Sequence, residues 1–289
     1  MKQSDSTQLT QVRINDEIYY QISNVDKMRP FFMSMVSDSN HWLFISSNGG
    51  VTAGRKNAEN ALFPYYTDDK ITESYDITGS KSIFWIIKQE NQFRWEPFSS
   101  RNEGNYQYTR NLYKSIYGNR ILFEEINHDL DITFRYRWSS SNEYGFVREA
   151  FLINSGSESV SISILDGLQN IIPAGVGSML QNQRSNLVDA YKRNELDRKS
   201  GIGIYALSAI IVDRAEPSEA LKANIAWSVG LDNPTYLLSG LQLHAFRSGI
   251  PVQQEEDIKA EKGAYFIHTT SSLAAGENKQ WMIIANVNQ

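Results

Sequence analysis

The sequence contains no cysteine. Disulfide bonds, thiolate zinc sites, iron–sulfur clusters and thiol nucleophiles are therefore excluded. No stretch approaches the about 20 apolar residues of a membrane-spanning helix, and the N-terminal segment MKQSDSTQLTQ lacks the apolar centre of a secretory signal. These features predict a cytoplasmic protein without membrane contact, although a periplasmic chain whose signal had been removed would look the same.

Clustered positive charge and metal-ligand spacings are also missing. The net charge is −5 with a pI near 5.5, and the basic residues are scattered, which argues against a nucleic-acid partner. None of the four histidines, His41, His128, His244 and His268, belongs to an HExxH-like motif, so no metal site is expected. No G-x-S-x-G nucleophile motif occurs. We expect no cofactor and no catalytic residue that a motif would identify.

Aromatic residues are abundant, at 12% of the chain, which favours β structure. In 130–138, apolar Leu130, Ile132, Phe134, Tyr136 and Trp138 alternate with polar residues, a period of two that predicts a half-buried strand. NSGSES, between 154 and 159, is interpreted as a hairpin connection, and DRAEPSEA (213–220) as a turn. Further strands are predicted at 11–22, 41–46, 82–88, 92–95, 120–126, 145–154, 159–166, 202–213, 221–231, 264–270 and 280–287.

One segment has helical periodicity. In 176–201, apolar residues recur at spacings of three, four or seven to eight, and Gly201 follows as a plausible C-cap, which predicts one helix near 176–199. Strands and helices do not alternate as parallel βαβ units require, and neither a linker nor a repeat divides the chain. The fold class predicted is mainly β: a large antiparallel β-sandwich with one inserted helix, forming a single domain over 1–289.

The densest run of polar and aromatic residues is SSNGGVTAGRKNAENALFPYYTDDK, from Ser46 to Lys70. Its glycines resemble a P-loop, but that motif needs Lys at 55 and a hydroxyl at 56, where this chain has Arg55 and Lys56. Ser47–Gly50 is instead predicted to be a two-residue hairpin turn. Amides, cations, carboxylates and tyrosine rings are the groups that bind sugars, although a plain solvated loop is the alternative. The candidate substrate-binding residues are Arg55, Lys56, Asn57, Asn60, Tyr65, Tyr66, Asp68 and Asp69.

Paired carboxylates are present but do not form an evident catalytic dyad. Glu124 and Glu125 are neighbours on a predicted strand and should point to opposite faces. Asp129 and Asp131 should share the polar face of a strand, which usually means simple solvent exposure. The strand tryptophans Trp85 and Trp95 are expected to be core residues rather than sugar-stacking surfaces.

Several stretches together resemble the N-terminal domain of cellobiose-phosphorylase-like proteins. They are RPFFMSMVSDSNHWLFISSNGGVTAGRKNAENALFPYYTDDK, WSSSNEYGFVREAFLINSGSESVSISILDGLQNIIPAG and the closing WMIIANVNQ, and DGLQNIIPAG is the most specific of these motifs. The resemblance implies a galactose-mutarotase-like supersandwich that precedes an (α/α)6 catalytic barrel. It also implies that the catalytic carboxylates lie in that barrel, for which 289 residues leave no room.

The function expected from this resemblance is an accessory, carbohydrate-binding β-sandwich domain of a glycoside hydrolase or phosphorylase. Its partners would be an oligosaccharide and the barrel domain, and a face freed from the barrel could support a homo-oligomer. One alternative is an independent oligosaccharide-binding module. The other is an aldose 1-epimerase, with His128 beside Glu124 or Glu125, or His244 beside Glu255 or Glu256, as acid and base. The sugar, the linkage and the choice between hydrolysis and phosphorolysis are not encoded in any motif.

Overall fold

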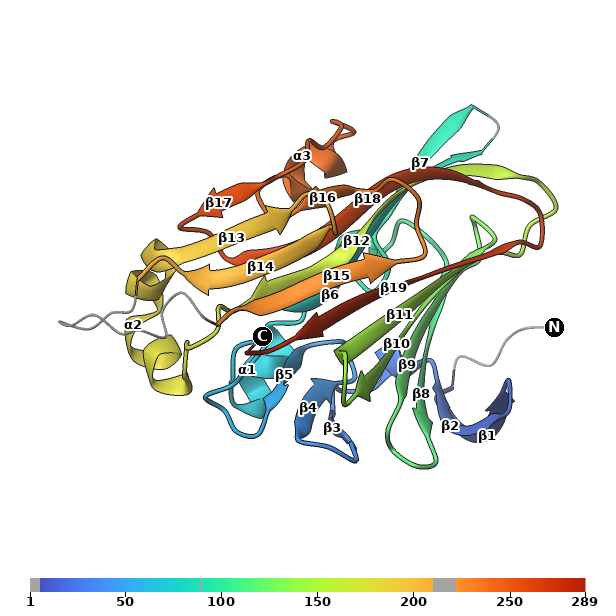
Figure 1. Ribbon diagram of the computed structural model, residues 1–289. Coiled ribbons are helices and arrows are strands. Elements are labelled where there is room, and N and C mark those ends of the chain that lie inside the picture. Colours follow the sequence, from blue (N-terminus) through green and yellow to red (C-terminus); the bar gives the residue numbers. More distant parts are fainter. Residues whose placement is uncertain (1–5, 89, 210–221, 289) are drawn as a thin grey trace.

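The computed structural model describes residues 6–88, 90–209 and 222–288 (Figure 1). Within these residues the chain is mainly β with large antiparallel sheets, so the predicted fold class is confirmed. The largest sheet has eleven strands in the order β1-β2-β8-β9-β10-β11-β19-β15-β14-β13-β17. These strands are Gln8–Ile14 (β1), Glu17–Ser23 (β2), Tyr108–Ser115 (β8), Ile121–Asn127 (β9), Ile132–Ser141 (β10), Gly145–Asn154 (β11), Asn278–Asn286 (β19), Asn224–Val229 (β15), Ile202–Leu207 (β14), Lys192–Asp197 (β13) and Asp257–Lys259 (β17).

Two smaller sheets and three short α-helices complete the described fold. A five-stranded sheet has the order β16-β18-β12-β6-β7, and a three-stranded sheet has the order β3-β4-β5. The strands are Thr235–Leu237 (β16), Gly263–Leu273 (β18), Val160–Ile171 (β12), Gly79–Lys88 (β6), Asn91–Trp95 (β7), Phe32–Met35 (β3), His41–Ser46 (β4) and Val51–Arg55 (β5). The helices are Asp68–Glu73 (α1), Ser178–Tyr191 (α2) and Leu243–Arg247 (α3), with short 3-10 turns at Val25–Lys27 (η1) and Ser100–Asn102 (η2).

The main core lies between one face of the large sheet, here called the inner face, and the two smaller sheets. In β10 the residues Ile132, Phe134, Tyr136 and Trp138 are buried on this face, as the alternation predicts. Phe134 packs against Phe84 of the five-stranded sheet, with ring centroids 5.0 Å apart. The alternation of apolar and polar residues in the sequence therefore identifies the core residues of β10 correctly.

The three-stranded sheet covers another part of the inner face. Its own buried residues, such as Leu43, Ile45 and Val51, belong to the same core cluster. The ring of His41 lies 5.0 Å from Phe146 of β11, in an edge-on arrangement. Figure 1 shows β3–β5 and α1 below the large sheet, with α2 at the side. The sandwich thus has one large curved layer and two smaller layers.

A buried ion pair joins the large sheet to the five-stranded sheet. Arg148 of β11 donates Nη1–H and Nη2–H to the two carboxylate oxygens of Asp166 in β12, at 2.7 and 2.9 Å. Both side chains are fully buried. Trp281 Nε1 donates to Asp166 at 2.6 Å, and Arg148 Nε donates to Ser80 Oγ at 2.8 Å. Because both charges are paired and further hydrogen-bonded, the low-polarity core tolerates them.

The predicted helix is real but shorter than expected. The helix α2 ends at Tyr191, and the next residues form strand β13. Lys192, Asn194 and Leu196 are buried while their neighbours are not. Burial therefore alternates residue by residue from this point, as in a strand, and no longer follows the helical repeat. Pairing with β14 and β17 stabilises the strand. Gly201 is therefore not a C-cap but lies in the turn before β14, with a φ of 73°.

Three local interpretations were wrong. NSGSES does not connect a hairpin, because β11 and β12 belong to different sheets. Asp129 and Asp131 precede β10 and lie in a turn, where Asp131 has a φ of 56°, so they share no strand face. The segment 11–22 is not one strand but parts of two, broken at Asn15 with a φ of 52°. The predicted turn at 213–220 lies outside the described residues.

The Asp166→Ala variant tests the buried ion pair. Its removal leaves the Arg148 guanidinium charged and unpaired in the core, so we expect the free energy of unfolding to fall by about 3–5 kcal/mol. Urea denaturation at neutral pH measures this change. The control is Lys88→Ala, which removes the partly exposed Lys88–Asp131 pair and should cost no more than about 1 kcal/mol. Equal losses in the two variants would contradict the role of the buried pair.

Candidate functional site

A cleft of about 340 Å³ opens beside the inner face of β8 and β9. Its volume falls in the range of about 300–1,000 Å³ that is typical of small-molecule sites. The walls come from η1 and the residues after it, the turn between β4 and β5, the loop after β7, and the two strands. The lining residues are Val25, Asp26, Lys27, Met28, Pro30, Ser47, Asn48, Tyr75, Phe98, Ser100, Glu103, Tyr108, Arg110, Asn111 and Phe123.

Arg110 is the cation of the cleft. Its Nε–H donates to Glu125 Oε2 at 2.7 Å and its Nη2–H to the Ser99 carbonyl at 3.2 Å, while the guanidinium lies 4.4 Å from the ring centre of Tyr108. Burial alone would lower the pKa of Arg110, but the charge and hydrogen bond of Glu125 raise it, so the group stays cationic. Nη1 makes no hydrogen bond with any described residue and remains available to a ligand.

Glu125 fixes the position of this cation and of the wall beside it. Besides Arg110, it accepts hydrogen bonds from Trp95 Nε1 at 2.7 Å and from the Phe98 backbone N–H at 2.6 Å. Phe98 has a φ of 63°, a conformation that costs a bulky residue energy. The bond to Glu125 holds this strained residue in place, with its ring against the cleft. The Glu125 carboxylate therefore fixes the Arg110 guanidinium, the loop after β7 and the Phe98 ring of the cleft wall.

Asp26 of η1, which also lines the cleft, has one carboxylate oxygen without a donor in the described part of the chain. Its Oδ1 atom is buried and has no hydrogen-bond partner among the described residues, while Oδ2 lies 3.4 Å from Lys27 Nζ. A buried carboxylate oxygen without a donor is unfavourable by about 1–3 kcal/mol or more. Because Oδ1 is shielded from solvent, a ligand hydroxyl in the cleft would remove this cost only if the Asp26 side chain turned toward it. Asp26 and Arg110 thus offer an acceptor and a donor in the same cleft.

The apolar wall of the cleft is aromatic. The ring of Phe98 lies edge-on to Tyr136, with centroids 5.2 Å apart, and Phe123 stacks on Tyr136 at 4.8 Å. These contacts continue into the main core, so the rings that reach the cleft are held rigidly. A rigid apolar face opposite a few polar groups suits an amphipathic ligand.

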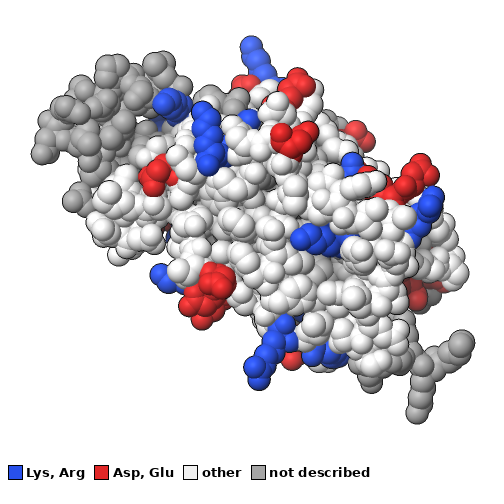
Figure 2. Space-filling view, turned by 90° about the horizontal axis from the view of Figure 1, so that it is seen from below, with Lys and Arg blue, Asp and Glu red and all other residues white. Residues whose placement is uncertain are grey.

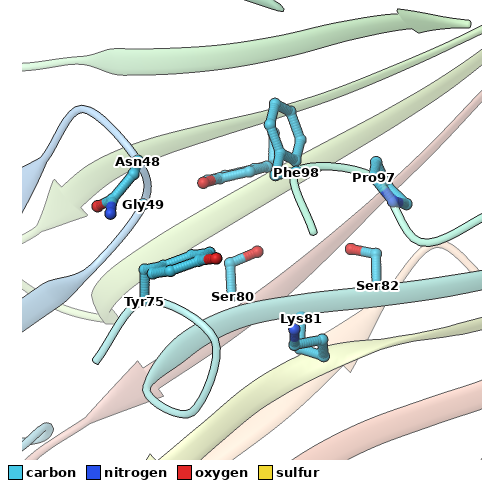
Figure 3. Close-up of a pocket in the computed structure, with 9 residues that line it drawn as sticks. Asn48, Gly49, Tyr75, Ser80, Lys81, Ser82, Pro97 and Phe98 are labelled. Carbon is cyan, nitrogen blue, oxygen red and sulfur yellow. The ribbon is translucent and has the colours of Figure 1, made fainter. Parts of the chain in front are cut away.

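A smaller cavity adjoins the cleft and shares Asn48, Tyr75 and Phe98 with it. Figure 3 shows Ser80 and Ser82 of β6 on one side of this cavity, and Phe98 and the turn with Asn48 and Gly49 on the other. Tyr136 also lines it, and burial raises the pKa of the Tyr136 hydroxyl above its ordinary value, which keeps it protonated at neutral pH. The remaining lining residues are Lys81 and Pro97.

A network of ion pairs holds the loops around both cavities. Lys81 bonds to Asp76 and, at 3.2 Å, to Glu96, and Arg247 of α3 binds both oxygens of Glu96 at 2.8 Å. Burial alone would raise the pKa of Glu96, but the Arg247 hydrogen bond and the Lys81 charge outweigh it, and the pKa is lowered. Glu96 is therefore ionised at neutral pH. Together with Arg101, which also pairs with Asp76, these residues connect the Tyr75 turn to the loop that carries Phe98.

The residues from Ser46 to Gly50 form the turn that carries Asn48 and Gly49 into the site. The predicted turn is confirmed, but it is longer than two residues, because Ser46 and Gly50 still pair through Ser46 N–H and the Gly50 carbonyl at 2.8 Å. Asn48 Nδ2 donates to the Thr72 carbonyl of α1 at 3.0 Å. A Cβ on Gly50 would come within 1.9 Å of the Ile71 carbonyl oxygen, so only glycine allows this approach to α1.

Four of the eight sequence-predicted residues lie where β5 leaves its sheet. Arg55 donates to Asn40 at 2.7 Å and to Asn286 near the end of β19 at 3.3 Å. Asn60 bonds to Asn57 at 2.7 Å and accepts a hydrogen bond from Asn288. Lys56 is exposed with a φ of 63°. This part of the loop is fastened to the C-terminal strand.

The other four lie around α1. Tyr65 is exposed and packs edge-on against Trp42 at 5.5 Å, and Tyr66 lies 5.9 Å from Lys70 Nζ. Asp68 and Asp69 form the first turn of α1 and are exposed. None of the eight is among the described residues that line the cleft or the adjoining cavity. The structure brings Arg55, Asn57 and Asn60 together near the end of β19. Tyr65 contacts Trp42, whose Nε1 bonds to Asn57. Their role in sugar binding remains a prediction.

The carboxylates considered for acid–base chemistry are already engaged. Glu124 accepts hydrogen bonds from Tyr113 and Asn111 at 2.7 Å and pairs with Arg135, on the face opposite to that of Glu125, as predicted. His128 is exposed and bonds to Thr109 Oγ1 at 2.8 Å. Glu255 accepts from Ser239 and the Leu238 N–H, and Glu256 pairs with Arg198. Trp95 is fully buried, as expected.

No protein-family model matches this sequence, and none of the curated proteins is similar to it. Solved structures match by fold. The Slr1438 protein from Synechocystis sp. PCC 6803 aligns with a TM-score of 0.50 and 10% identity, over 90% of this chain and 96% of its own. A candidate aldose 1-epimerase from Escherichia coli K12 aligns with a TM-score of 0.44 and 11% identity, over 90% of this chain and 99% of its own.

A polysaccharide lyase aligns with a TM-score of 0.44 and 12% identity over 89% of this chain, which spans only 32% of the lyase. At such identities the likeness concerns the fold alone. No helix among the described residues has the length and apolar character needed to cross a membrane.

The Gly50→Ala variant tests the packing of the turn on α1. The added methyl group would overlap the Ile71 carbonyl, so the turn must move, and we expect a loss of about 1–3 kcal/mol in the free energy of unfolding. Gly240→Ala is the matched control, because its methyl group would meet only Leu243 at 3.7 Å and should change stability by no more than about 1 kcal/mol. Urea denaturation compares both variants. A Gly50→Ala protein as stable as the wild type would contradict this close approach.

Proposed function

We propose that this chain is a carbohydrate-binding β-sandwich domain and that the Asp26–Arg110 cleft holds the sugar. The observation that carries the proposal is the composition of the cleft, which combines an unpartnered carboxylate oxygen, a fixed guanidinium and rigid aromatic rings. A pyranose has hydroxyl groups around its edge and apolar C–H groups on its faces. The hydroxyls suit Asp26 and Arg110, and the C–H groups suit the Phe98 wall.

The role proposed for the domain is accessory. The resemblance to the N-terminal domain of cellobiose-phosphorylase-like proteins supports a partnership with an (α/α)6 barrel that supplies the catalytic carboxylates. Glu124, Glu125 and Glu255 each accept several hydrogen bonds, and Glu256 pairs with Arg198, which also favours binding over acid–base catalysis at these positions. The barrel partner and a homo-oligomer belong to the same proposal and rest on the resemblance, not on a contact of the described residues.

Calorimetric titration with neutral mono- and oligosaccharides tests the cleft. We expect at least one sugar to bind the wild type, and Asp26→Ala to weaken that binding about tenfold, because a charged hydrogen bond contributes about 1.5–3 kcal/mol. Asp68→Ala is the control, since it removes a carboxylate from the predicted loop and leaves the cleft intact. If Asp68→Ala weakens binding and Asp26→Ala does not, the sugar site lies on the loop instead.

Two activity measurements distinguish the accessory role from the alternatives. The chain alone should neither cleave glycosides nor accelerate the interconversion of α- and β-glucose in a polarimeter. Accelerated interconversion would instead support the epimerase alternative, and glycoside cleavage by the isolated chain would overturn the accessory role. Restored turnover when a barrel domain is supplied would support it.

A further inference from the structure

Four aromatic side chains form a row across the outward face of the three-stranded sheet, away from the cleft. In order they are Phe32 of β3, Phe44 and Trp42 of β4, and Tyr65 beyond β5; we call them the aromatic row. Successive ring centroids are 5.6, 6.1 and 5.5 Å apart. The strand alternation explains the placement, because the intervening residues, such as Leu43 and Ile45, face the core. Phe32 and Tyr65 are 41% and 40% exposed, and the other two rings are half-buried.

The ring of Trp42 is held in a fixed position on the sheet. It lies over Gly54 of the neighbouring strand, where a Cβ would come within 2.4 Å of Trp42 Cζ2. Its Nε1–H donates to the Asn57 carbonyl at 3.2 Å. One side of the ring is therefore occupied by backbone, and the other side is turned away from the sheet. Glycine at position 54 is what permits this arrangement.

The surroundings of the aromatic row are polar, and the exposed charges in the flanking segments are of both signs, such as Lys56, Glu59 and Asp68. Ser34 is exposed and pairs with Phe44 across β3 and β4, on the same face. Asn57 and Asn60 lie at the Trp42 end. Figure 2 views the molecule from the side on which Figure 1 places β3–β5, and in that view Lys and Arg are interspersed with Asp and Glu rather than gathered in a patch of one sign. Rings flanked by hydroxyl and amide groups, without a field of one sign, suit an uncharged polar ligand.

We propose that the aromatic row is a second binding site, for a linear, uncharged polysaccharide of pyranose units. The planes of successive rings are inclined by 20°, 34° and 90°, so the C–H groups of the sugar units would contact the exposed ring faces, which carry partial negative charge, in different orientations along the row. At one end the Asn57 side-chain nitrogen would donate to a sugar hydroxyl, whereas the Asn60 amide is already bonded to Asn57 and Asn288. The small area of the row favours this occupant over a folded protein. Four rings that are at most about 40% exposed offer roughly 300 Å², whereas a stable protein interface buries about 800 Å² per partner.

The test is retardation of the folded chain in native gels that contain a soluble polysaccharide. We would use hydroxyethylcellulose and glycogen as uncharged chains and polygalacturonate as a charged one. At least one uncharged chain should retard the wild type, and polygalacturonate should not. The double variant Phe32→Ser/Tyr65→Ser removes the two most exposed rings, and its dissociation constant should rise at least tenfold. Tyr117→Ser, which removes an aromatic ring that is 75% exposed outside the row, is the control and should bind as the wild type does.

The site does not depend on the cleft, and the variants separate the two. Asp26→Ala should keep wild-type retardation, and the double variant should keep any calorimetric binding of small sugars. The proposal is overturned if neither uncharged chain retards the wild type, if the double variant is retarded as strongly, or if polygalacturonate binds best. It is also overturned if the wild type sediments as a dimer that the double variant abolishes, because the row would then be a protein contact. Urea denaturation confirms that the variants are folded.

Discussion

The bidentate pair between Arg148 and Asp166 is the interaction around which the sandwich is arranged. It connects two sheets through the middle of an otherwise apolar core, and Ser80, Ser82 and Trp281 complete its hydrogen bonds. An apolar contact tolerates small sliding between layers, but a bidentate ion pair does not, because its geometry is directional. The pair therefore sets the position of β6 relative to β11. Ser80 and Ser82 also line the cavity next to the cleft, so the same constraint determines the shape of the site.

The two sites proposed here differ in how their side chains are held. In the cleft, the charges and the strained Phe98 converge on Glu125, and a buried carboxylate organises groups from β7, β8 and the following loop. In the aromatic row, the strand alternation and Gly54 suffice. A cleft of this kind suits a single sugar unit with defined hydroxyl positions, whereas a row of exposed rings on a sheet surface tolerates many related chains.

The sequence predicted best what depends on local periodicity. The alternation in 130–138 identified the buried residues of β10, and the Asn-Gly pair identified the turn that reaches the site. The prediction failed where pairing with strands distant in the sequence determines the secondary structure. The helix-like sequence of β13, for example, forms a strand because it pairs with β14 and β17. The cleft was missed for the same reason. Asp26, Arg110 and Glu125 are ordinary charged residues in the sequence, and only strand pairing and the return of the chain after β2 bring them together. The GRKNAEN segment was conspicuous, yet much of its polarity fastens the loop to Asn286 and Asn288.

The position of β19 has a consequence for how the molecule folds. This strand lies between β11 and β15 and so joins the two halves of the large sheet, although it is the last strand of the described chain. Arg55 closes the same region by contacting Asn286, 231 positions later. Contacts of such separation are formed late and slowly, because long loops must close first. During synthesis, β11 therefore presents an open edge until residues 278–286 have emerged, and the sheet becomes continuous only when β19 inserts.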